Sequence, residues 1–474
     1  MSSPASIVRP AYVISGLIAA VFLIALAAFP GQGSAMEGSF FQGQVSAEQK
    51  KCQAKKPAKA KAACLKTVKG KATAATKKAM AGIKGLYGHN LQQSQIPSRN
   101  GTLVWSKELP TTAGAARTEF VLYSSKSYPG DKKIVVSGTM SVPEGTPPAG
   151  GWPVVSWAHG TTGLADQCAP SRGGDQGSYG GAEPLVEGWL EDGYAVLATD
   201  YEGLGTPKIH PYLVGVSEAR GVLDIVRASR SADPNLSKKV VIAGHSQGGH
   251  AALFAAEEAP KWAADFDHQG TVAYAPASGL TTQAIGIGTL PADAYGISAL
   301  ATSILRGAVA ADPRIDPALL LSEKALELYP LTETECLGEL GDRFAEAQIS
   351  PGELLIQDSL FTPNGSLFMD VLTKANPDVE TDRPLLIPQG LQDTTVLPGL
   401  TTTLVERGHA GTPSLLALNP GLVDYQTYGD GPPAMNITPG PSTHGSILAD
   451  AEAQVDAFLL DGFGLPPLPP LPTR

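Results

Sequence analysis

One serine in this sequence lies in a pattern that could make it a nucleophile. Ser246 is the centre of a Gly-x-Ser-x-Gly pattern at residues 244–248. An apolar run at 240–243 precedes the pattern, and an alanine-rich run follows it. A buried strand, a sharp turn and a helix would present the serine hydroxyl above the edge of a sheet. Glycines suit such a turn because, without a Cβ, they let the strand and the helix approach closely.

A serine hydroxyl becomes nucleophilic when a base lies within hydrogen-bond reach and an acid fixes the tautomer of that base. With this kind of turn the expected order along the chain is serine, acid, histidine. Only two of the eight histidines, His409 and His444, come after a plausible acid. We predict that His444 is the base, because it lies in a loop just before the last helical pattern. His409, where a helical pattern ends, is the alternative.

The acid is predicted at Asp393. This residue follows the apolar run 384–388 and opens a loop, so its carboxylate can face the carboxyl edge of a sheet. The alternative interpretation of Asp393 is a helix cap. Asp424, which also lies near a predicted strand, is the second candidate for the acid.

Two backbone donors are needed to hold the oxyanion that forms during acyl transfer. The N–H of Gln247 is one candidate, and the loop 159–163 supplies the other, with Gly160 and Thr161 as the donor residues. The Thr161 hydroxyl could add a further donor. We interpret His159 as a residue that fixes this loop. The carboxylates of Asp200 and Glu202 are interpreted as shaping the floor of a pocket.

Apolar runs that alternate with helical spacing surround these residues. After early antiparallel strands at 118–123 and 133–140, strands are predicted at 153–158, 193–199, 240–243 and 270–275, and helices at 218–230 and after residue 248. This alternation favours an α/β fold with a mostly parallel central sheet and helices on both faces, as in the α/β-hydrolases. We expect core segments at 96–279 and 381–462, a helical cap inserted at 280–380, and a proline-rich tail at 463–474. The last core helix is predicted at 447–460.

Residues 1–35 have the pattern of a secretory signal peptide. Arg9 is the only charge before an uncharged apolar run from Ala11 to Phe29, and the small residues 33–35 follow. Retention as a membrane anchor is the alternative. The sequence thus predicts a secreted or envelope-associated protein. Export makes the four cysteines, Cys52, Cys64, Cys168 and Cys336, candidates for disulfides, and three pairings are open.

A separate segment, 36–95, is rich in lysine and alanine. Its stretch Lys50–Lys84 has 12 lysines and no acidic residue, although the whole chain has a net charge of −10. Such a basic segment could make peripheral contact with an anionic membrane or cell-wall polymer. A solvated helix is the alternative. The segment lacks the interleaved aromatic residues of a nucleic-acid module, so no nucleic-acid partner is predicted.

The motifs at residues 157–163, 168–171, 200–203 and 244–249 together resemble the secretory lipase family, which includes fungal lipase A enzymes and exported actinobacterial relatives. The resemblance covers about residues 100–460. It implies a triad of Ser246, Asp393 and His444, and a helical cap over an acyl pocket. It also implies a disulfide between Cys168 and Cys336.

Together, these observations predict a secreted serine hydrolase that cleaves carboxylic esters, a triacylglycerol lipase or a carboxylesterase. Its partner would be a lipid or ester substrate, and the chemistry needs neither a metal nor an organic cofactor. A peptidase on the same fold is one alternative. A catalytically inactive protein that binds the cell envelope is another. The sequence carries no signal for an oligomeric state.

Overall fold

The computed structural model describes residues 85–173, 176–409, 411–429 and 441–465. The predicted signal peptide, the Lys50–Lys84 segment, Cys52 and Cys64 lie outside these ranges, as does most of the predicted tail. Across the ranges given, no helix combines the length and the apolar character that a membrane span requires.

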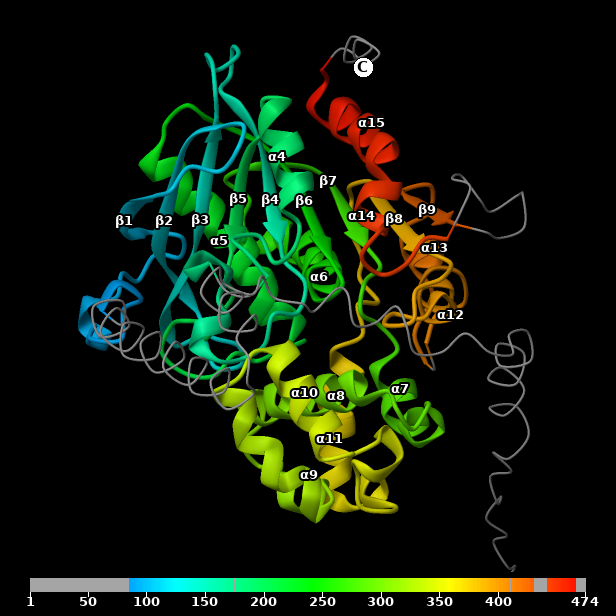
Figure 1. The fold of residues 1–474 in the computed structure, drawn as a ribbon. Helices are drawn as coiled ribbons and strands as arrows, with labels where there is room; N and C mark the ends of the chain where they lie inside the picture. Colours follow the sequence, from blue (N-terminus) through cyan, green and yellow to red (C-terminus); the bar gives the residue numbers. More distant parts are fainter. Residues whose placement is uncertain (1–84, 174–175, 410, 430–440, 466–474) are drawn as a thin grey trace, which may run out of the picture. The chain divides into compact units, whose positions relative to one another are not determined.

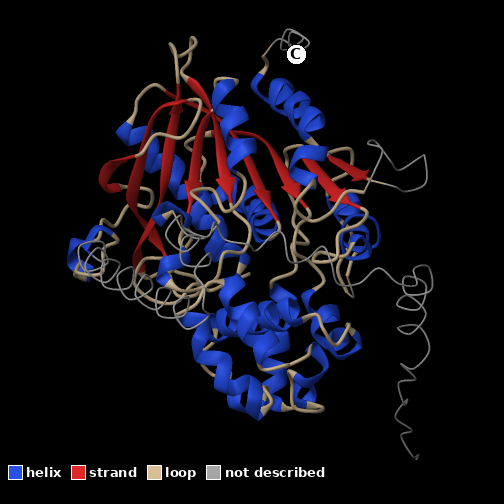
Figure 2. Ribbon diagram, in the orientation of Figure 1, coloured by secondary structure: helices blue, strands red, loops and turns tan. Residues whose placement is uncertain are grey.

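The described chain forms one nine-stranded sheet with the order β1-β2-β3-β5-β4-β6-β7-β8-β9 (Figures 1 and 2). The first three strands and β5 pair antiparallel, and β5, β4, β6, β7, β8 and β9 pair parallel. The strands are β1 (Leu103–Leu109), β2 (Ala115–Lys126), β3 (Lys133–Pro143), β4 (Trp152–Ala158), β5 (Ala195–Thr199), β6 (Leu236–His245), β7 (Asp267–Tyr274), β8 (Leu385–Gly390) and β9 (Val423–Tyr428).

Helices cover both faces of this sheet. One face packs against helices α5 and α6 and the segment that contains α12, and the other packs against α4, α14 and α15. The helices of the core are α4 (Glu183–Glu191), α5 (Gly215–Ala232), α6 (Gln247–Trp262), α12 (Pro398–Thr402), α13 (Leu415–Leu418), α14 (Ile447–Asp450) and α15 (Glu452–Phe463).

Burial on both faces explains the continuous apolar runs of the central strands. In β6, Val240 and Ile242 contribute to the core on the α5–α6 side, whereas Val241 and Ala243 contribute to the core on the α15 side. Successive side chains of a strand point to opposite faces, so a strand covered on both sides is apolar at every position. The predicted alternation of parallel strands and helices is confirmed.

The last predicted helix is not continuous in the structure. The pattern from residue 447 to 460 predicts a single helix, but the structure divides it into α14 and α15. Ala451 interrupts the helix, with φ −95° and ψ 1°. The buried residues Ile447, Ala451, Val455 and Leu459 are spaced by four, and all of them lie in the same core. Periodicity therefore records the buried face and not the interruption.

A group of helices lies between β7 and β8 in the sequence. It comprises α7 (Leu280–Gly286), α8 (Tyr295–Ala311), α9 (Glu323–Leu328), α10 (Leu337–Glu346) and α11 (Pro363–Lys374). These helices share an apolar cluster to which Leu164, Tyr212 and Leu213 also contribute. We call this group the cap. It meets the rest of the fold where Gly307 of α8 packs on the backbone of Tyr212; a Cβ on Gly307 would lie 2.4 Å from the Tyr212 oxygen.

A disulfide joins the cap to the core. Cys168, in the loop after β4, bonds to Cys336 at the start of α10, with a Cα–Cα distance of 5.5 Å. The structure therefore contains the pairing that the family resemblance implies. The bridge spans 168 residues. Closing so long a loop restricts the unfolded chain and contributes at most about 5 kcal/mol in the chain-entropy model.

Replacing both bridged cysteines, in the double variant Cys168→Ser with Cys336→Ser, should lower the free energy of unfolding by about 2–5 kcal/mol, because the unfolded chain regains the freedom that the bridge removes. Denaturant unfolding of the two proteins, monitored by tryptophan fluorescence, would measure the difference. Wild-type protein treated with reductant serves as the matched control and should approach the variant. Equal midpoints for the variant and the oxidised wild type would contradict the stabilising role.

Candidate active site

Ser246 lies on a tight turn between β6 and α6. Its backbone has φ 58° and ψ −114°, in the region that residues with a side chain rarely adopt. The flanking glycines permit this turn. A Cβ on Gly248 would lie 1.8 Å from the Ala158 oxygen at the end of β4, and one on Gly244 would lie 2.1 Å from the Gly248 oxygen. Any side chain at either position would push the strand and the helix apart.

The turn is held by backbone hydrogen bonds. The Ser246 N–H donates to the Tyr274 oxygen of β7 at 2.9 Å, and the Ser246 oxygen accepts from the N–H groups of His250 and Ala277 at 3.0 and 3.2 Å. Ser246 is 8% exposed. Strain in the backbone of a functional residue persists when the surrounding contacts determine it in this way.

His444 and Asp393 form a hydrogen-bonded pair. The Nδ1 of His444 donates to Oδ2 of Asp393 at 2.7 Å. The same carboxylate accepts from the N–H groups of Thr395 and Val396 at 2.8 Å and from Nε2 of Gln389 at 3.2 Å. The buried Asp393 carboxylate therefore accepts all of these hydrogen bonds. Because it accepts from Nδ1 of His444 as well, the neutral imidazole carries its proton on Nδ1. Nε2 of His444 is then free to accept a proton.

His245 connects this pair to the nucleophile. Its Nε2 donates to the backbone oxygen of His444 at 2.7 Å, and the two rings lie 4.5 Å apart. Burial, reinforced by the nearby His444 ring, lowers the pKa of His245 to about 3. His245 is therefore neutral, with its one N–H directed at the loop that carries the base. Because His245 immediately precedes Ser246, this bond places the His444 loop beside the turn.

The structure thus brings Ser246, His444 and Asp393 to the same edge of the sheet. The Asp393–His444 bond is formed, whereas no hydrogen bond joins the Ser246 hydroxyl to His444 among the described residues. Serine–histidine contacts of hydrolases are often long without substrate and shorten in the reacting complex. The geometry therefore places the loop that carries His444 beside the turn that carries Ser246.

The predicted oxyanion residues lie next to Ser246. A Cβ on Gly160 would lie 3.8 Å from Cβ of Ser246. Gln247 is the first residue of α6, where backbone N–H groups have no partner within the helix. In the described part of the chain, the N–H groups of Gln247 and Thr161 have no hydrogen-bond acceptor. The Thr161 hydroxyl, which we had expected as a further donor, is bonded to the Tyr212 hydroxyl at 2.7 Å.

His159 lies at the base of this loop. Its Nδ1 donates to the Gly160 oxygen at 2.6 Å, and its own backbone oxygen accepts from the Tyr201 hydroxyl at 2.9 Å. Burial lowers the pKa of His159 to about 4, so the ring is neutral. These contacts favour its interpretation as a residue that fixes the loop.

The alternative residues have other partners. His409 pairs with Asp378 at 2.9 Å, and the Asp424 carboxylate accepts from the side chains of Gln426 and Gln454. Neither side chain is hydrogen-bonded to Ser246 or His444 among the described residues.

The buried carboxylates of Asp200 and Glu202 also bind protein groups. Asp200 accepts from the hydroxyls of Ser137 and Ser171, and Glu202 accepts from the hydroxyl of Ser217 and the N–H of Tyr128. Both therefore fasten the segment after β5 to its neighbours.

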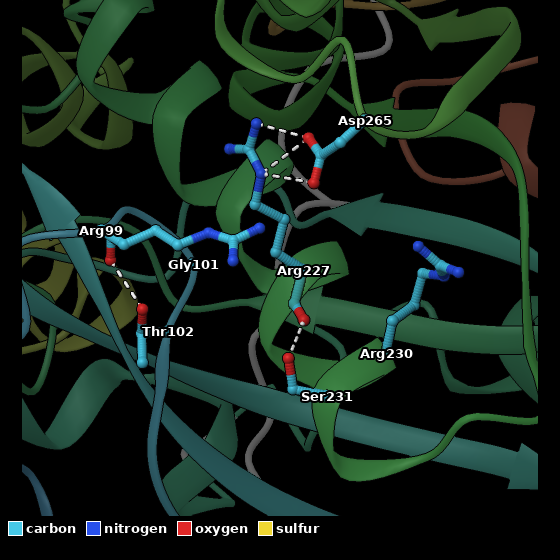
Figure 3. Close-up of a pocket in the computed structure, with 7 residues that line it drawn as sticks. All are labelled: Arg99, Gly101, Thr102, Arg227, Arg230, Ser231 and Asp265. Atoms are coloured by element: carbon cyan, nitrogen blue, oxygen red, sulfur yellow. Dashed lines mark hydrogen bonds and ion pairs between the residues drawn. The ribbon is translucent and has the colours of Figure 1, made fainter.

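A surface depression of about 250 Å³ lies elsewhere in the molecule (Figure 3). The guanidinium groups of Arg99, Arg227 and Arg230 line it together with Asp265, to which Arg227 donates. Asp265 precedes β7 and Ser246 follows the parallel strand β6, so the two sites lie at opposite edges of the sheet. The Ser231 hydroxyl in this depression donates to the Arg227 oxygen and has no histidine beside it.

Sequence reasoning did not find three residues that support the site, namely His245, Gln389 and Glu218. His245 occupies a variable position of the pattern at 244–248, where any residue type satisfies the motif. Gln389 is the penultimate residue of β8, and its amide donates to Asp393. Glu218 appeared only as the start of a helical pattern. Their proximity to the site depends on contacts between residues far apart in the sequence.

Parts of this chain are similar in sequence to known lipases. The model of the family "Secretory lipase" matches residues 181–358. Lipase A of Moesziomyces aphidis is 28% identical over 36% of this chain, and the alignment spans 38% of that protein. A protein of Mycobacterium tuberculosis named "Probable inactive lipase MT1628" is 29% identical over 65% of this chain and 68% of its own length.

Solved structures show the same fold. The rice cell wall degrading esterase LipA of Xanthomonas oryzae has a TM-score of 0.60 at 20% identity, covering 77% of this chain and 98% of its own. Lipase A of Candida antarctica in its closed state has a TM-score of 0.59 at 18% identity, covering 81% and 88%. The predicted α/β-hydrolase fold is confirmed. The resemblance seen in the sequence motifs is also confirmed, since the family model matches residues 181–358: over this range the chain is similar to the secretory lipases.

Proposed function

We propose that this protein is a secreted serine hydrolase that cleaves carboxylic esters, as a lipase or carboxylesterase, through an acyl-enzyme on Ser246. The observation that carries the proposal is the hydrogen bond of 2.7 Å between His444 and Asp393 beside the strained turn of Ser246. One relative bears the name of an inactive lipase. This chain has the nucleophile, the base and the acid, and their arrangement supports activity.

In the proposed reaction, Oγ of Ser246 attacks the ester carbonyl carbon while its proton passes to Nε2 of His444. The N–H groups of Gln247 and Thr161 hold the negative charge on the carbonyl oxygen. His444 then gives the proton to the departing alkoxide, which leaves as an alcohol. Water, deprotonated by His444, attacks the acyl-enzyme and releases the carboxylic acid. Asp393 keeps the imidazole in the required tautomer throughout.

Export is part of the proposal. The apolar run Ala11–Phe29 favours passage through a membrane, and the disulfide Cys168–Cys336 is of a kind that persists in oxidising compartments. Ester hydrolysis at a cell surface or outside the cell is consistent with both features.

The substitution Ser246→Ala should abolish hydrolysis of p-nitrophenyl esters, with a loss on the order of 10⁶-fold in kcat, because the proposed reaction begins with attack by the Ser246 hydroxyl. Steady-state kinetics and labelling with a fluorophosphonate probe would measure the effect. Ser231→Ala, in the depression of Figure 3, is the matched control and should retain both activity and labelling. Activity that survives in the Ser246 variant would refute the assignment, and faster cleavage of matched amides than of esters would favour a peptidase.

The substitution Asp393→Asn should lower kcat on the order of 10⁴-fold. The amide that replaces the carboxylate would donate to Nδ1 of His444, and the ring would then carry its proton on the nitrogen that faces Ser246. The same ester assay measures this loss. Asp424→Asn tests the rival acid with the same change of side chain, and it should leave kcat near that of the wild type. A large loss of kcat in Asp424→Asn and a small one in Asp393→Asn would instead identify Asp424 as the acid.

A further inference from the structure

A buried carboxylate lies beneath the turn that carries Ser246. Glu218, in the first turn of α5, is completely buried. Its Oε1 accepts from the N–H of Leu213 at 3.0 Å and from Nε2 of Gln247 at 2.8 Å. Its Oε2 faces Nδ1 of His250 at 2.9 Å. The proposed reaction assigns no step to this carboxylate, yet one of its partners is the residue that follows the nucleophile.

The charge of Glu218 is balanced by His250. Nε2 of His250 donates to the Ala375 oxygen at 2.8 Å, because a carbonyl can only accept. The neutral imidazole would then have no proton on Nδ1. One further proton therefore lies between Nδ1 and Oε2, and the pair is neutral as a whole. A carboxylate with this partner and two N–H donors can stay buried without an unpaired charge.

This carboxylate fixes the side chain of Gln247. The amide nitrogen of Gln247 has two protons, one donated to Glu218 and the other to Nε2 of His210 at 2.8 Å. His210 accepts there because its Nδ1 donates to the Glu202 oxygen, and burial lowers the pKa of His210, which keeps the ring neutral. With both amide protons engaged, the residue whose backbone N–H is a proposed oxyanion donor has little freedom to rotate.

The second oxyanion donor is tied to the same carboxylate. Leu213, whose N–H donates to Glu218, is adjacent to Tyr212, and the Tyr212 hydroxyl bonds to the Thr161 hydroxyl at 2.7 Å. Tyr212 is also the residue on which Gly307 of the cap packs. The Glu218 carboxylate therefore holds both proposed oxyanion donors. It binds the side chain of Gln247 directly, and it reaches Thr161 through the backbone of Leu213 and the hydroxyl of Tyr212.

We propose that Glu218 is a positioning residue that aims the N–H groups of Gln247 and Thr161 at the developing oxyanion, directly through Gln247 and indirectly through the Leu213–Tyr212 segment. This inference rests on the proposed ester hydrolysis at Ser246. Glu218 touches neither the substrate nor the reacting atoms. Its effect is on kcat, because aimed donors act mainly on the charge that forms in the transition state.

The experiment compares an ester with its thionoester, in which sulfur replaces the carbonyl oxygen. Sulfur is a poor hydrogen-bond acceptor, so well-aimed donors favour the ester strongly and misaimed donors favour it less. Glu218→Gln keeps the shape of the side chain and removes its charge. Gln247→Met removes only the side-chain anchor of the first donor, and Tyr212→Phe removes only the hydroxyl that binds Thr161.

We expect each variant to lower kcat for the ester by about 10–100-fold, short of the 10²–10³ that follows complete loss of a donor. KM should change less than about 3-fold and the ester-to-thionoester rate ratio should fall, because the affected interaction is made mainly in the transition state. Asp224→Asn is the matched control. This carboxylate of α5 is buried too, but it accepts hydrogen bonds from Ser125, Arg227 and Trp262, and its loss should lower stability while the rate ratio stays unchanged.

Folded Gln247→Met and Tyr212→Phe proteins with wild-type kcat and an unchanged rate ratio would overturn the inference, even if Glu218→Gln fails to fold. An equal fall of the ratio in the Asp224 variant would overturn it too, since general loosening would then explain the effect. Ser246→Ala separates the two proposals. If hydrolysis is lost in Ser246→Ala but unchanged in the Gln247 and Tyr212 variants, only the positioning role of Glu218 is rejected. If hydrolysis survives Ser246→Ala, both the positioning role and the proposed function are rejected.

Discussion

The site depends on the contact between Gly248 and the end of β4. A Cβ on Gly248 would lie 1.8 Å from the oxygen of Ala158 and 2.8 Å from that of His159. Only a residue without a side chain lets α6 begin so close to this loop. The approach places the first N–H of α6 and the loop that begins at Gly160 close to Ser246. The positive φ of Ser246 is the local consequence of this packing, since the chain must reverse within one residue.

A second close approach sets the position of the base. A Cβ on Gly390, the last residue of β8, would lie 2.6 Å from the Ser442 oxygen, so the loop that carries His444 rests on the end of this strand. The Gln392 N–H donates to the same oxygen at 2.8 Å. Asp393 follows directly and meets His444. The acid and the base are thus brought together by backbone contacts, and their own hydrogen bond completes an arrangement that the backbone already favours.

Much of the fold could be predicted from the residues because its signals are local. A strand buried on both faces is apolar at every position, as in 240–243, and a helix on the sheet repeats its apolar residues every three or four positions, as in α5. The division of the final helix at Ala451 escaped prediction, because the same spacing of apolar residues continues through the interruption. The supporting roles of His245 and Glu218 could not be predicted for another reason. Their partners lie 199 and 29 residues away, in His444 and Gln247, and no pattern within a short window records such contacts.

The sequence by itself determined the turn at Ser246, since glycines on both sides, an apolar strand before and a helix after leave the chain few other conformations. It also limited the base to two histidines. Only the tertiary structure shows how the surroundings of these two histidines differ. Each has an aspartate partner, Asp378 for His409 and Asp393 for His444, so pairing alone does not distinguish them. The distinction arises because the His444 loop lies against Gly390 and accepts a hydrogen bond from His245, next to the nucleophile. Such proximity is a property of how distant segments pack, which the order of residues does not express.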